Sequence, residues 1–268
     1  MFSSQTAFQR FADIVRGPEE HISLAEAALV IASEFRSESI VKDYLRWIRE
    51  TASDFPAGPD LSEVSGFFSD HLGFCGDRDD QGDPRNNLLD HVIEHRRGMP
   101  ISLSIVLLEM ASRKDWRFEG VALPGHFMVR DATTGYYIDT YNRAQVLDEA
   151  QARRRTMGKI EQSEWKSRWS RASSPKQIIF RLLSNLKLSF LTREQFDRAA
   201  AVQEKLLLLT PGRAQEYRDL GVVSASAGDS RMARKFLGEY LERRPNAADA
   251  ERVRCQLQVL VDEADRLN

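Results

Sequence analysis

The residues best suited to chemistry in this chain are a histidine and an aspartate, His126 and Asp139, which follow an apolar segment that starts at Pro100. A nucleophile at a helix N-terminus, a histidine acting as general base and a carboxylate that orients the histidine make up a Cys-His-Asp acyl-transfer site. The order along the chain fits this arrangement, but the helix start carries Pro100 and Ser102 where a cysteine is needed. The sequence therefore predicts the base and its orienting carboxylate without the usual thiol.

A buried helix and a β-hairpin are predicted to position these residues. Residues 100–113 are apolar on nearly every face, which is typical of a buried helix, and proline suits the first turn. Strand-like runs follow at 119–123, 127–130 and 136–138, with Thr133-Thr134-Gly135 as the turn. His126 and Asp139 lie almost symmetrically about this turn, so antiparallel pairing would place their Cβ atoms ~5 Å apart.

The segments before this core are predicted to be mainly helical. Amphipathic spacing indicates two helices within 22–51, one over 61–71 that stops at Gly73, and one from Asn86 or Asn87 to His95 or Arg96 that stops at Gly98. Residues 76–85 between the last two are polar and indicate a loop.

The C-terminal third has the spacing of a helical repeat. Pro211 and Pro245 are 34 residues apart, which is the period of a tetratricopeptide repeat. The characteristic positions of the second repeat are Tyr217, Leu220, Gly221, Gly228, Ala233 and Leu237. Two repeats and a capping helix over 247–267 are expected after a charged helical connector.

Four segments carry a resemblance to a known family: Asp83–Asn87, Arg97–Leu103, Pro124–Phe127 and Ile138-Asp139. Together they resemble the bacterial SirB-type family, which joins a transglutaminase-like core to C-terminal tetratricopeptide-like repeats. The resemblance implies a helix-rich α+β fold: a papain-like core with a small antiparallel sheet, then an all-α repeat domain. We expect the core with its N-terminal helices at 1–150, the connector at 151–176 and the repeats at 177–268.

The resemblance also places the missing nucleophile. In active transglutaminase-like proteins the helix begins Gly-x-Cys, and this pattern laid on Gly98-Met99-Pro100 puts proline at the cysteine position. The catalytic histidine and aspartate carry over onto His126 and Asp139. Ser102 lies two residues beyond Pro100, about 200° further round the helix. The run Asp139-Thr140-Tyr141-Asn142 departs from the family's Asp-Pro-Phe-Asn, which should alter the loop but not the carboxylate.

Two kinds of function fit this pattern. A pseudoenzyme that binds a protein or peptide is the favoured interpretation, because proline offers no nucleophile. The alternative is an amide or ester hydrolase or acyl transferase that uses His126 and Asp139 with Ser102 as nucleophile. Serine in a first turn more often satisfies free amides. Cys75 is a second candidate nucleophile, although a lone cysteine is more often inert.

A metal site is a third, less favoured interpretation. His91-Val92-Ile93-Glu94-His95 matches His-x-x-Glu-His, in which two histidines one turn apart bind zinc and the glutamate is a general base. The further carboxylates considered for the site, Glu161 and Glu164, lie in the charged connector. Histidines without metal are the expected state, and no cofactor is expected.

Composition limits the partners and the compartment. The 268-residue chain has a formal charge of -2, which gives no reason to expect nucleic acid or an anionic membrane as partner. Neither a secretory signal nor an apolar stretch of about 20 residues is recognisable. Two cysteines, Cys75 and Cys255, are expected to be free thiols. These features favour a cytoplasmic protein.

Overall fold

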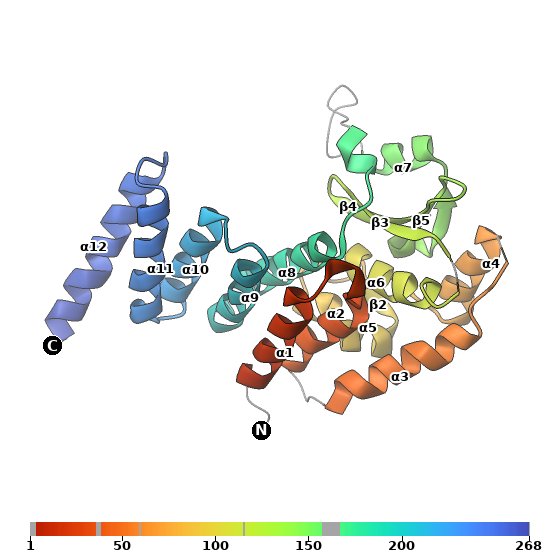
Figure 1. The fold of residues 1–268 in the computed structure, drawn as a ribbon, viewed down its shortest axis with the longest axis horizontal. Helices are drawn as coiled ribbons and strands as arrows, with labels where there is room; N and C mark the ends of the chain where they lie inside the picture. The colour runs from red at the N-terminus through yellow and green to blue at the C-terminus, as the bar shows by residue number, and fades with distance from the viewer. Residues whose placement is uncertain (1–3, 36–38, 59, 115, 157–166, 268) are drawn as a thin grey trace. The chain divides into compact units, whose positions relative to one another are not determined.

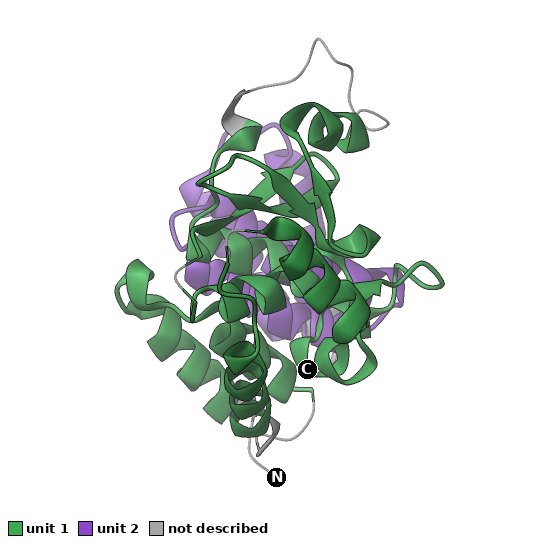
Figure 2. Cartoon of the chain, turned by 90° about the vertical axis from the view of Figure 1, so that its right-hand side faces the viewer, with its two compact units in different colours: residues 1–182 green, residues 183–268 purple. Residues whose placement is uncertain are grey.

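The computed structural model describes residues 4–35, 39–58, 60–114, 116–156 and 167–267. The chain divides into two compact units, residues 1–182 and 183–268 (Figure 2). Unit 1 combines helices with a small antiparallel sheet, and unit 2 is helical. The expected α+β class and the helical C-terminal region are confirmed.

Unit 1 contains α-helices, strands and short helical turns (Figure 1). Its α-helices are α1 (Ser4–Arg16), α2 (Leu24–Ser33), α3 (Ser39–Ser53), α4 (Leu61–Gly66), α5 (Leu89–His95), α6 (Pro100–Ala111), α7 (Glu149–Thr156) and the first part of α8 (Pro175–Thr192). Its strands are β1 (Cys75–Gly76), β2 (Arg97–Gly98), β3 (Phe118–Leu123), β4 (His126–Asp131), β5 (Tyr137–Asp139) and β6 (Gln145–Leu147). Short helical turns are η1 (Glu19–His21), η2 (Phe67–His71, a π-helical turn), η3 (Pro84–Asn87), η4 (Thr140–Asn142) and η6 (Ser167–Ser170).

Helix α6 forms the centre of unit 1. Every residue from Ile101 to Ala111 is buried, as its continuous apolar sequence predicts. Pro100 occupies the first turn, where an amide would have no intrahelical partner. The helix packs against β3 and β4 on one side and against α2, α3 and α5 on the other (Figure 1).

The four-stranded sheet has the order β3-β4-β5-β6, with antiparallel neighbours throughout. A buried apolar cluster joins the sheet to α7: Val121, Leu123, Met128, Tyr137, Leu147 and Ala152. The hairpin register differs from the predicted one. The pairs are Val129 with Ile138 and Arg130 with Tyr137, so continuing this register would place Asp139 opposite Met128 rather than His126. His126 and Asp139 are therefore diagonal neighbours.

Helix α5 ends differently from the prediction. Its C-cap is Arg96, a non-glycine residue with φ 58°, and not Gly98. Gly98 lies in β2, paired in parallel with Gly76 of β1. A Cβ on Gly98 would come 2.8 Å from Ser102 Oγ and 2.9 Å from Val92 Cγ1. The glycine therefore permits close packing of this strand against two helices rather than a helix stop.

Unit 2 is built from helices in succession. These are the end of α8, α9 (Phe196–Leu209), α10 (Ala214–Ser226), α11 (Ser230–Arg243) and α12 (Ala250–Leu267). Gly221 of α10 allows close approach to α11, because a Cβ there would lie 2.7 Å from Leu237 Cγ. The predicted capping helix begins at Ala250 rather than at residue 247. Among the described residues, no helix is both long and apolar enough to cross a membrane.

Candidate functional site

The structure brings His126 and Asp139 together. His126 Nε2 lies 2.8 Å from Asp139 Oδ1, and the side chains are 14% and 0% exposed. Diagonal neighbours in an antiparallel pair share a face and are separated by ~7–8 Å, which a histidine side chain can span. The pair therefore forms despite the shifted register, and the Nε2 contact leaves Nδ1 as the nitrogen that would have to meet a nucleophile.

The turn before β4 fixes the start of the strand at His126. Leu123 pairs with His126 across Pro124-Gly125, and Gly125 has φ 66°. Proline followed by a glycine of positive φ is the sequence of a type II turn. The Pro-Gly-His run thus anchors the histidine at a defined strand end.

Asp139 is held as a carboxylate by Asn142 as well as by His126. Asn142 Nδ2 donates to Oδ2 at 2.7 Å, and the Asn142 amide donates to Oδ1 at 3.3 Å. Burial alone would raise the pKa of Asp139. The hydrogen bond and charge of His126 and the hydrogen bonds from Asn142 outweigh burial, so the pKa lies below the ordinary 3.8. The sequence interpretation missed Asn142, although Asp-x-x-Asn is a spacing at which a side chain can cap a short turn.

The first turn of α6 lies beside this pair. Thr140 Oγ1, in the residue next to Asp139, donates to the Pro100 carbonyl at 3.3 Å and lies 3.0 Å from Ser104 Oγ. Thr140 therefore links the strand end that carries Asp139 to the first turn of α6. The helix start itself carries the proline ring.

Ser102 is directed into the protein core. Its hydroxyl donates to the Asn86 carbonyl at 2.7 Å and lies 3.0 Å from the Met99 carbonyl, and the residue is fully buried. The serine thus bonds carbonyls rather than the free amides expected from its place in the helix. This geometry gives Ser102 a role in joining α6 to η3 and does not favour it as a nucleophile.

A polar loop and a tyrosine pack over the same region. Asn86 Nδ2 donates to Asp77 Oδ2 and to the Asp80 carbonyl, both at 2.8 Å. The Tyr141 hydroxyl donates to the Asp77 carbonyl, and the Tyr141 ring lies so close to Gly76 that a Cβ on residue 76 would overlap it. The ring centroids of Tyr141 and His126 are 6.3 Å apart, edge to face. Tyr141 therefore joins the loop to the histidine.

Cys75 precedes Gly76 in β1 and is a buried free thiol. Its backbone amide donates to the Arg96 carbonyl at 3.0 Å. Cys255, in α12, is an exposed free thiol. The expectation of two free thiols is met in the structure.

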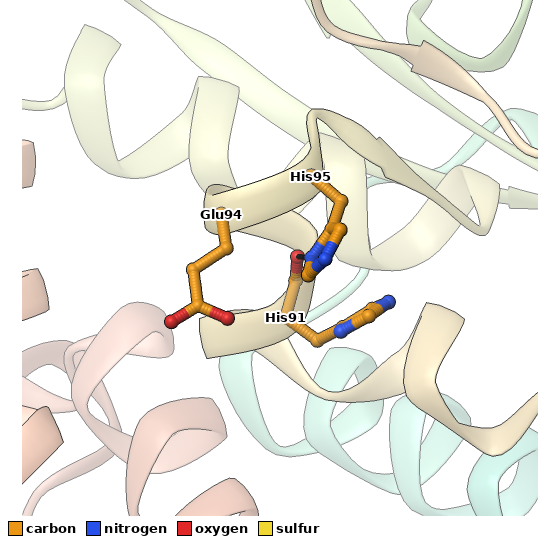
Figure 3. Close-up of side chains that lie close together, drawn as sticks. All are labelled: His91, Glu94 and His95. Atoms are coloured by element: carbon orange, nitrogen blue, oxygen red, sulfur yellow. Dashed lines mark hydrogen bonds between the residues drawn. The ribbon is translucent and has the colours of Figure 1, made fainter.

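The two histidines of the His-x-x-Glu-His pattern lie on α5. Their rings stack with centroids 3.9 Å apart, and Glu94 lies on the same helix (Figure 3). Glu161 and Glu164, the further ligands considered from the sequence, lie outside the described residues.

A hollow of about 490 Å³ lies within unit 2. It is lined by Lys187 and Leu191 of α8, Arg218, Asp219, Val222, Val223 and Ser226 of α10, and Arg252, Val253 and Gln256 of α12. Alternate helices of a repeat array contribute one face each, which is how such arrays form a concave binding surface. The lining combines apolar side chains with three cations and one carboxylate.

The core and the repeats each match a known family. Residues 30–184 match the transglutaminase-like superfamily, and residues 186–258 match the tetratricopeptide repeat. The chain belongs to the transglutaminase-like superfamily and carries a C-terminal tetratricopeptide repeat region.

Individual relatives extend over most of the chain. A UPF0162 protein of Xylella fastidiosa (strain 9a5c) is 29% identical over 91% of this chain and 92% of its own length. UPF0162 protein PA3419 of Pseudomonas aeruginosa is 31% identical over 80% of this chain and 77% of its own. Protein SirB1 of Salmonella typhimurium is 28% identical over 64% of this chain and 65% of its own. The SirB-type resemblance is thereby confirmed. No solved structure matches the chain.

Proposed function

We propose that this chain is a non-catalytic transglutaminase-like protein of the cytoplasm that binds a protein or peptide partner through its repeat unit. The observation that carries the proposal is a histidine–aspartate pair for which the start of α6 offers no nucleophile. His126 and Asp139 are in contact, yet Pro100 stands at the helix start and the Ser102 hydroxyl is bonded to backbone carbonyls. Without a thiolate or an activated hydroxyl there, the pair has no nucleophile to deprotonate.

The hollow in unit 2 supports a binding role. Val222 is 40% exposed on its rim, where an apolar side chain of a ligand would remove it from water. Lys187 lies 3.4 Å from Asp219 and Arg218 lies 2.8 Å from it, so the negative charge of Asp219 is neutralised. Arg218 and Arg252 also pair with Asp249, at 2.6 and 3.9 Å, so three cations meet two carboxylates and one net positive charge remains. The preferred ligand is therefore a peptide with an apolar side chain next to a carboxylate.

A peptide library displayed on phage and selected on the untagged full chain tests this proposal. Enriched peptides should pair an apolar side chain with Asp, Glu or a free C-terminus. Val222→Arg should weaken their binding by about tenfold or more, because it places a charge in a desolvated contact. Val259→Arg, at an exposed valine of α12 outside the hollow, is the matched control and should bind as the wild type does. Equal affinity of the two variants would contradict the assignment of this surface.

The alternative is an amide or ester hydrolase or acyl transferase. The 2.8 Å contact between His126 and Asp139 favours it, since a carboxylate that orients the histidine is part of such a site. A panel of activated esters and acyl amides offered to the wild type, His126→Ala, Cys75→Ala and Ser102→Ala decides the matter. Turnover lost in His126→Ala and in one nucleophile variant would establish the enzyme. Absence of turnover in the wild type agrees with the non-catalytic proposal, and turnover unchanged in His126→Ala would exclude the His126–Asp139 pair as its source.

A further inference from the structure

A cluster of metal-binding side chains lies on α5, on an element that the proposed function does not use. His91, Glu94 and His95 each offer one ligand atom, and these atoms all lie within 4.8 Å of one another (Figure 3). Zinc binds imidazole nitrogen and carboxylate oxygen at ~2.0–2.2 Å, so ligand atoms in a tetrahedral site are about 3.3 Å apart. Glu94 and His95 are exposed and His91 is half-buried. Side-chain rotations can therefore bring the ligand atoms from their present separations of up to 4.8 Å to the spacing of a tetrahedral site.

The hydrogen bonding of His95 prepares it as a ligand. His95 Nδ1 lies 3.0 Å from the His91 backbone carbonyl. A carbonyl oxygen only accepts, so Nδ1 carries the proton and Nε2 presents its lone pair. Ligating histidines commonly use this arrangement, in which the second nitrogen donates to a carbonyl and fixes the ring.

His91 and Glu94 complement this ligand. His91 is half-buried, and its ring stacks on that of His95 with centroids 3.9 Å apart. The Tyr44 hydroxyl of α3 donates to Glu94 Oε1 and orients the carboxylate from outside the cluster. Two imidazoles and one carboxylate are donors that suit zinc-type ions.

We propose that His91, Glu94 and His95 bind one divalent zinc-type ion on the surface of α5, with Tyr44 as an orienting residue. In this arrangement Glu94 is a ligand, unlike the general base that the His-x-x-Glu-His pattern suggests. Three protein ligands leave a coordination position open to water or to a ligand from another molecule. The proposal stands independently of peptide binding.

Calorimetric titration of the untagged, chelator-treated full chain with Zn²⁺ tests the site. One equivalent should bind. His91→Gln and His95→Gln should each weaken binding by at least about tenfold, because even the loss of an outer hydrogen-bond partner costs 10–100-fold. Glu94→Gln should also weaken Zn²⁺ binding. Tyr44→Phe should weaken Zn²⁺ binding less, because Tyr44 contacts a ligand and not the ion.

Two variants serve as matched controls. His21→Gln removes a histidine of η1, and Cys255→Ser removes the exposed thiol; both should bind Zn²⁺ as the wild type does. Circular dichroism of each variant separates loss of a ligand from loss of fold, and Glu94→Gln, at an exposed position, gives a variant expected to fold. Absence of binding in the wild type, or binding that survives His91→Gln and His95→Gln, would overturn the proposal.

Discussion

Ser102 and Asp139 are both fully buried polar residues near the start of α6, but their partners give them different roles. The Ser102 hydroxyl bonds main-chain carbonyls of Asn86 and Met99, so it connects segments. Asp139 bonds an imidazole and an amide side chain, so it orients other functional groups. Hydrogen-bond partners, rather than residue type or burial alone, distinguish the connecting role of Ser102 from the orienting role of Asp139.

Ser102→Ala is therefore expected to affect stability and not chemistry. The variant loses the 2.7 Å hydrogen bond to the Asn86 carbonyl, although that carbonyl still accepts from the Met99 amide at 3.0 Å. Because the acceptor stays paired, the free energy of unfolding should fall by about 1 kcal/mol. Urea unfolding of the wild type and the variant measures this. An unchanged unfolding free energy would contradict the structural role.

The pH dependence of stability reports on Asp139. Its pKa in the folded chain is below 3.8, so the folded state binds fewer protons than the unfolded state between the two values. This contribution to stability is complete above the unfolded value and is lost as pH falls through the folded value. In Asp139→Asn, stability should be lower at neutral pH and should fall less steeply below about pH 4.

Urea unfolding at a series of pH values from neutral to acidic measures these slopes. His126→Gln should flatten the slope in the same direction, because it removes one of the interactions that lower the pKa of Asp139. At neutral pH, Asp139→Ala should cost about 3 kcal/mol, since it breaks a buried pair. An Asp139→Asn curve parallel to that of the wild type would show that this carboxylate does not titrate as described.

At the scale of elements, the sequence predicted those segments in which a hydrophobic pattern continues over many residues. Helix α6 was predictable because its apolar residues continue for three turns, and the hairpin because a turn separates two alternating runs. Strands β1, β2 and β6 have two or three residues each, which is too short for a period to show. The stop of α5 was misplaced because Gly98 serves close packing, and only the folded chain shows what lies 2.8 Å from its missing Cβ.

Substitution of two helical glycines in unit 2 distinguishes the effect of side-chain packing on stability from the effect of helix propensity. Gly221→Ala would place a Cβ 2.7 Å from Leu237 Cγ and 2.9 Å from the Leu237 backbone nitrogen, whereas a Cβ on Gly238 meets nothing within 4 Å. Overpacking at Gly221 should cost about 1–3 kcal/mol. Gly238→Ala, the matched control in α11, should stabilise by ~0.5–1 kcal/mol because alanine is the better helix former. Chemical denaturation of both variants measures the sign of each change in the free energy of unfolding. Equal changes would refute the packing argument.

At the scale of the whole chain, spacing and resemblance were sufficient to identify the two kinds of structure. The 34-residue interval between Pro211 and Pro245 predicted the repeat, which the family match over 186–258 confirms. The expected position of the absent cysteine followed from the resemblance to Gly-x-Cys. The partners of Asp139 and the lining of the hollow arise from residues far apart in the sequence, such as Leu191 and Val253, and no local pattern reveals them.

The proposed activities belong to different residues, and this leads to a prediction for the full chain. Asp139→Asn should leave affinity for the selected peptides unchanged, and Val222→Arg should leave Zn²⁺ binding at α5 unchanged. Mutations at sites that share no partner act independently, so the double variant should show the sum of the single effects on each free energy. Measuring peptide and Zn²⁺ affinities for both single variants and the double variant checks this. A loss of peptide affinity in Asp139→Asn would instead make the dyad part of the binding function, and the remnant interpretation of His126 and Asp139 would fail.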